Sequence, residues 1–155
     1  MNRSEKGSAR HSAFAKRNRH KKGLFLPMER SAANKLVLPI RLALETLRRG
    51  RGRRDAIFSM VEVTLLVGFL IEAGDSVISK ETVDSAERRL HRALEDLGGS
   101  DGMELDPELV ETLTVVVNEY DRVLREARLI SILEANERLG AFTHAAVAER
   151  RHLDA

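Results

Sequence analysis

The chain has 155 residues, a length typical of one domain, and its composition excludes several classes of site. It has no Cys, which excludes disulfides, thiolate metal sites and thiol nucleophiles and fits a reducing, cytoplasmic setting. Five Phe, one Tyr and no Trp disfavour a surface that stacks single-stranded bases. Sixteen of the 26 Lys and Arg lie in the first 54 positions, which carry about +13, whereas the other 101 carry about −11. Such a basic block indicates a polyanionic partner.

The first 23 residues are predicted to form a disordered basic arm in front of one helical domain at 24–155. They contain eight Lys or Arg and only two bulky apolar residues, Met1 and Phe14, too few to offset the entropy of ordering. The short apolar segment 24–28 then anchors the arm to the domain.

The first helix is expected over about 31–49. Its apolar residues recur at helical spacing, and Gly50 is well suited to end it. Pro39 either kinks this helix or marks its true start. The expected core-facing residues are Leu36, Ile40, Ala43, Leu44 and Leu47.

A second helix is expected over about 56–73, with Asp55 as its N-cap, and is apolar nearly all round, as a central buried helix would be. A third, over about 80–97, has Ser79 as its candidate cap and is followed by a Gly-rich loop at 98–102. Asp106 and Pro107 then open the longest helix. No segment has a strand pattern, so we predict an all-α bundle of four to five helices.

The last long helix has a heptad-like apolar seam from Leu113 to Ile130, which could pair with a second copy of the chain. Gly140 is expected to interrupt it, so that residues from Ala141 to about His152 form either a short final helix or a bent continuation. The acidic residues of this region, including Asp121 and Glu134, are expected to pair with Arg four positions later on a solvated face.

The candidate site residues are all basic, and we expect them to contact nucleic-acid phosphates. A solubilising tail, an anionic lipid surface or organelle targeting would also explain the arm, and the helix macrodipole would explain Arg48 and Arg49. The arm supplies Lys16, Arg17, Arg19, Lys21 and Lys22, and the turn between the first two helices supplies Arg48, Arg49, Arg51, Arg53 and Arg54.

No catalytic, metal-binding or cofactor-binding residue is predicted. Glu87, His91 and Glu95 share one helix face, but an exposed charged helix explains them better than a metal site. Glu149 and His152 have the spacing of a di-iron ligand pair, but a second such pair is missing. Glu62, the one acid within the apolar helix, is expected to pair with an Arg of the first helix rather than to act as a catalytic carboxylate.

The segment 36–74 consists of a helix, the turn Arg-Arg-Gly-Arg-Gly and an apolar helix ending in Glu-Ala-Gly. It resembles small helical proteins of proteobacterial chromosomes, plasmids and phages, some of them labelled Fis-family regulators. The resemblance covers about 40 residues and implies DNA binding. Fis proteins carry a C-terminal helix-turn-helix, whereas the residues from Leu129 onward lack the Ala-x-x-x-Gly turn of that motif, so no site residue is transferred.

We therefore expect a non-enzymatic nucleic-acid-associated protein, such as a small bacterial regulator of transcription. The alternative is an interaction or adaptor module that docks a protein partner on its acidic helices. In that case the basic arm would only solubilise or target the chain. No apolar run approaches the roughly 20 residues of a membrane-spanning helix.

Overall fold

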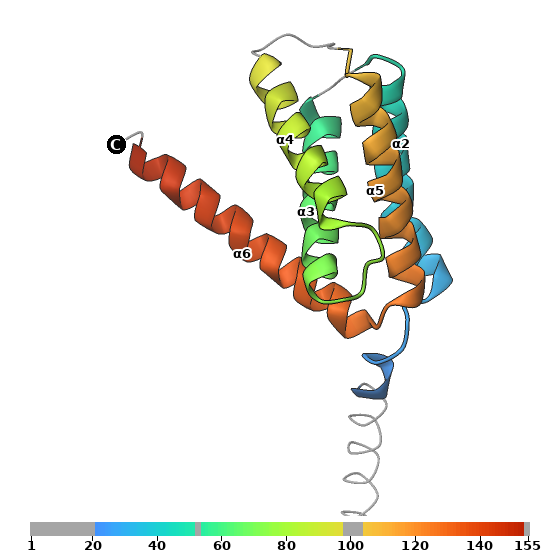
Figure 1. Ribbon diagram of the computed structural model, residues 1–155. Coiled ribbons are helices and arrows are strands. Elements are labelled where there is room, and N and C mark those ends of the chain that lie inside the picture. Colours follow the sequence, from blue (N-terminus) through green and yellow to red (C-terminus); the bar gives the residue numbers. More distant parts are fainter. Residues whose placement is uncertain (1–20, 52–53, 98–103, 154–155) are drawn as a thin grey trace, which may run out of the picture.

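The computed structural model describes residues 21–51, 54–97 and 104–153, and these ranges contain helices and connections but no strand. Helices α2 (Arg30–Arg48), α3 (Arg54–Glu72), α4 (Lys80–Asp96) and α5 (Pro107–Glu126) run alternately up and down as a bundle (Figure 1). Helix α6 (Leu129–Leu153) starts at one end of the bundle and projects away from it. The predicted all-α bundle is thus confirmed.

Helix α3 is the centre of the fold, because it packs against α2, α4, α5 and α6. The buried residues of α3 span about half of its circumference, and they include Ile57, Met60, Leu66 and Leu70. A helix that is apolar on most of its circumference can be stable in water only when neighbours cover it on several sides. The central position predicted for this helix is therefore confirmed.

Two of the predicted helix starts have the expected caps. The Ser79 hydroxyl accepts a hydrogen bond from the Thr82 N–H, and Asp106 accepts one from the Glu108 N–H with Pro107 at the first helical position. Both bonds satisfy backbone donors that a helix start leaves without a partner. The start of α3 differs from the expectation, because Asp55 lies inside the first helical turn rather than before it.

Helix α2 continues through Pro39 without ending. Pro39 and Lys35 are both exposed, so solvent can satisfy the Lys35 carbonyl, which lacks the usual donor four residues later. The buried face uses Ala33 and Val37, together with Leu44 and Leu47, while Leu36 is exposed. The prediction that Leu36 faces the core is wrong, because it lies about 100° around the helix from Val37.

Of the two alternatives expected after Gly140, the separate final helix is wrong, since α6 continues through that residue. The chain breaks earlier, at Ala127, whose backbone is extended, with ψ 157°. A glycine within a helix costs only about 1 kcal/mol relative to alanine, which is too little to end a helix by itself.

The N–H groups that α6 exposes at its start are satisfied from the other end of the chain. Leu129 donates to the carbonyl oxygen of Leu26 and Ile130 to that of Leu24, each over 2.9 Å. The segment expected to anchor the arm therefore does so through its backbone, while the Phe25 and Leu26 side chains are exposed.

The apolar seam of α5 is used inside the chain. Leu113, Val116, Tyr120 and Val123 are buried in the core that α5 forms with α2, α3 and α4. In this fold the seam has no exposed face to offer a second copy, so any self-association must use another surface.

Candidate functional site

The Arg-rich turn joins α2 to α3 at one end of the bundle. Gly50, with φ 67°, donates to the Leu47 carbonyl, and Arg51 donates to the Thr46 carbonyl. This pair of bonds is a Schellman motif, which requires the left-handed conformation that glycine adopts without strain. The glycine thus fixes the turn and places Arg51 directly after it, exposed to solvent.

The Arg residues of the turn differ in how far they are neutralised. Glu45 accepts from Arg49 Nε over 2.8 Å and from Arg48 over 3.5 Å, and Arg48 also donates to the Thr114 hydroxyl. Arg51 makes no ion pair with any residue that the structure describes. Arg51 is thus the turn residue best placed to bind an external anion.

Arg54, in the first turn of α3, has its guanidinium 5.9 Å from the centre of the Phe58 ring. Such a contact orients the cation without neutralising it. Arg54 is exposed, so it remains available to an anion beside Arg51.

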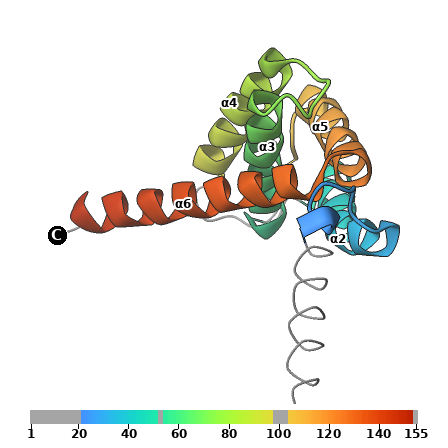
Figure 2. The same ribbon diagram turned by 90° about the horizontal axis from the view of Figure 1, so that it is seen from below.

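The structure places the described members of the two basic clusters at opposite ends of α2. Lys21 and Lys22 form an exposed helical turn before α2, beside the start of α6 (Figures 1 and 2), whereas the Arg-rich turn follows the end of α2. The 19 residues of α2 separate them by about 28 Å. The described members of the two clusters therefore do not form one continuous patch. Four of the predicted site residues lie outside the described ranges, namely Lys16, Arg17, Arg19 and Arg53.

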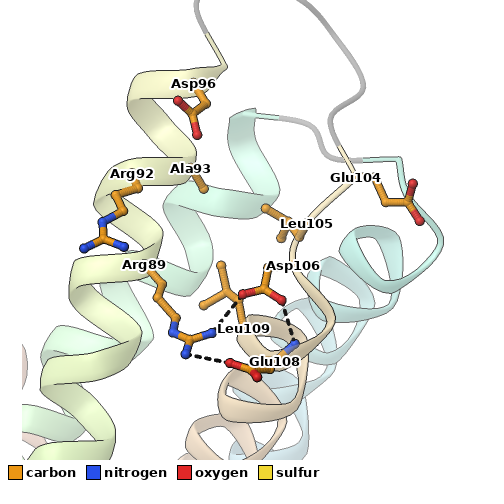
Figure 3. Close-up of a pocket in the computed structure, with 9 residues that line it drawn as sticks. All are labelled: Arg89, Arg92, Ala93, Asp96, Glu104, Leu105, Asp106, Glu108 and Leu109. Atoms are coloured by element: carbon orange, nitrogen blue, oxygen red, sulfur yellow. Dashed lines mark hydrogen bonds and ion pairs between the residues drawn. The ribbon is translucent and has the colours of Figure 1, made fainter.

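A polar groove of about 420 Å³ lies between the end of α4 and the start of α5, at the same end of the bundle as the Arg-rich turn (Figure 3). Arg89 reaches across it and pairs with Asp106 at 2.8 Å and Glu108 at 2.7 Å. These carboxylates raise the pKa of Arg89, the bond to Glu108 contributing most. With Asp96 and Glu104 also lining it, the groove is acidic despite Arg89 and Arg92.

The most buried charged group is Glu119, which the sequence pattern placed on a solvated face. Its carboxylate accepts from the Ser76 hydroxyl and the Val77 N–H, each over 2.7 Å, and from Arg122 over 2.8 Å. These donors lower its pKa to about 2, the bond from Arg122 being the largest cause. Glu119 thereby fastens the α3–α4 connection to α5. The sequence offered little signal for this, because Ser76 and Val77 lie more than 40 positions before Glu119.

Two predicted pairings are not formed. Glu62 is exposed and has no ion pair in the described part of the chain, since Arg41 of α2 bonds Asp121 over 2.8 Å instead. Glu134 loses its expected partner because Arg138 bonds Glu72 over 2.6 Å. The expected pair of Asp121 with Arg125 is confirmed at 2.7 Å.

The described ranges contain neither a cluster of metal ligands nor a membrane-spanning helix. No group of three metal-ligating side chains occurs there, and His91 simply pairs with Glu95 on an exposed surface at 3.3 Å. Among the helices described, none combines the length and apolarity needed to cross a membrane. The chain matches no protein-family model, no curated protein and no solved structure.

Proposed function

We propose that this protein associates with nucleic acid and contacts the phosphate backbone through its basic arm and its Arg-rich turn. The observation that carries the proposal is the charge distribution, with about +13 in the first 54 residues and an acidic remainder. Clustered Lys and Arg bind a polyanion favourably because they release its condensed counterions. Arg51, which is exposed and makes no ion pair with a described residue, lies beside the first turn of α3 and adds a local reason, since a helix start also favours anions.

Separate clusters, about 28 Å apart, suit a long polyanion better than a small one. Successive phosphates along one strand of a duplex span such a distance within one turn of the helix. Phosphate contacts position a protein without reading bases. The proposed affinity therefore depends strongly on charge and little on the base sequence.

The test is to measure the affinity of the full chain for duplex DNA and for duplex RNA by fluorescence anisotropy at several salt concentrations. We expect the logarithm of the association constant to fall linearly with the logarithm of salt concentration, with little difference between unrelated sequences. Absence of binding to both duplexes at low salt would reject the proposal.

The acidic groove between α4 and α5 favours a second function, the docking of a basic protein segment. Four carboxylates line it, and only Arg89 and Arg92 oppose them. A titration with an Arg-rich peptide tests this idea: Glu104→Gln should weaken binding, whereas Glu81→Gln, at the other end of α4, should not.

A further inference from the structure

The outer half of α6 is a helix without a neighbour. All nine residues from Ala141 to Glu149 are exposed, although most of them are apolar. In Figures 1 and 2 this part of the helix leaves the bundle and diverges from α4. Isolated helices of this length are marginal in water, because helix formation is cooperative and its first turn is costly. A packing partner would therefore stabilise it.

The apolar stripe that holds α6 against the bundle continues along this free half. Ile132 and Ala135 are buried, Leu139 is half-buried against the core, and Phe142 and Ala146 follow at the same alternating spacing of three and four. Phe142 is nevertheless 52% exposed. The same face of one helix is thus buried in its first half and uncovered in its second.

We propose that the free half of α6 packs antiparallel against the free half of α6 in a second copy of this chain. The large Phe142 of each copy then lies opposite the small Ala146 of the other copy. This contact occurs twice, as the two-fold symmetry of a dimer requires. Large and small residues facing each other across a helix pair fill the space between the helices.

Charge complementarity supports the same register. With Phe142 opposite Ala146, Glu149 of one copy lies beside Arg138 of the other, and both residues occupy the same flank of the stripe. In an antiparallel pair of identical helices, a given flank of one helix lies beside the same flank of the other helix. Arg138 already bonds Glu72 and lies over the Phe69 ring at 4.3 Å, and it remains half exposed. Arg138 would then bond two carboxylates, Glu72 of its own chain and Glu149 of the other copy. Arg89 and Arg122 each bond two carboxylates in the same way within this fold.

Sedimentation equilibrium of the full chain tests the proposal. We expect the average mass to rise from 17.4 kDa towards twice that value as concentration increases. Phe142→Glu should raise the dissociation constant at least about tenfold, because it places charges at the centre of the pair. The matched control is Val147→Glu, since Val147 is equally exposed, at 55%, but lies about 140° away from Phe142 around the helix. Circular dichroism checks that both variants keep their helices.

The register is tested by mixing two single-cysteine variants, Phe142→Cys and Ala146→Cys, in a chain that has no other Cys. On oxidation the mixture should give more crosslinked dimer than either variant alone. A strictly monomeric wild type at all concentrations would overturn the proposal, as would an equal effect of Phe142→Glu and Val147→Glu. Equal crosslinking in the mixture and in the separate variants would overturn the antiparallel register.

Discussion

The backbone N–H of Leu129 donates to the carbonyl oxygen of Leu26 over 2.9 Å, so the start of α6 is capped by a segment 103 positions earlier in the chain. Ile130 makes the same kind of bond to Leu24. The two bonds satisfy backbone donors at the start of α6 and hold the segment before α2 against it. Truncation from the N-terminus should therefore leave the stability of the fold unchanged until it removes this segment, and should reduce the stability beyond that point.

Deletion of residues 1–20 should leave the melting temperature unchanged, because the carbonyl groups of Leu24 and Leu26 remain. Deletion of residues 1–26 should destabilise the fold by roughly 1–3 kcal/mol, since two backbone donors of α6 lose their partners. Thermal unfolding measures the difference, and hydrogen exchange at Leu129 and Ile130 localises it. An identical melting temperature for the two truncations would contradict the capping role.

The binding proposal predicts unequal effects of the Arg residues in the turn. Arg51→Ala should weaken duplex binding and reduce the salt slope by about 1, as expected for one lost phosphate contact. Arg49→Ala should do less, because Glu45 already neutralises Arg49. Glu45→Gln should strengthen binding, since it releases both Arg48 and Arg49.

The matched control for these variants is Arg92→Ala, which removes an exposed cation from the acidic groove at the same end of the bundle. It should leave duplex binding unchanged. If Arg92→Ala and Arg51→Ala weakened binding equally, overall charge rather than the turn would control the affinity.

Glu119 should make stability depend on pH in the acid range. Its pKa is about 2 in the fold against an ordinary 4.5, so its contribution is complete above pH 4.5 and is lost as pH falls towards 2. Glu119→Gln should cost roughly 2–3 kcal/mol near neutral pH, and the difference from wild type should shrink as the solution is acidified. Urea unfolding at pH 7 and pH 3 measures this.

The control is Glu126→Gln. Glu126 bonds the same Arg122 over 2.6 Å, but its side chain is 62% exposed, so its removal should cost at most about 1 kcal/mol. Equal losses for Glu119→Gln and Glu126→Gln at pH 7 would show that burial of Glu119 contributes nothing.

Substitution by alanine should change the stability of the fold in opposite directions at two glycines. Gly140 lies inside α6, and a methyl group there would meet no atom within 4 Å, so Gly140→Ala should stabilise the helix by up to about 1 kcal/mol. Gly74 has φ 81° at the end of α3, so Gly74→Ala should destabilise the fold by about 1–2 kcal/mol. Circular dichroism with thermal unfolding compares them. Loss of helicity in Gly140→Ala would mean that the helix does break there.

Local chemistry made much of the fold predictable from the sequence. Ser79, Asp106 and Gly50 act on backbone groups within a few positions, so their caps and turn can be inferred from neighbouring residues alone. The apolar circumference of α3 likewise determines that it must be central, whatever surrounds it. The basic character of the candidate site is a property of composition, and it too needs no structure.

Only the tertiary structure decided the charge pairs between distant positions and where the last helices divide. Arg138 has an acid four residues before it, yet it bonds Glu72, and Glu119 is buried because Ser76 and Val77 donate to it from another connection. The start of α6 depends on carbonyl groups of Leu24 and Leu26, and the separation of the two basic clusters depends on the direction of α2. All of these bonds and placements join positions far apart in the chain, and no local periodicity or propensity carries information about such distances.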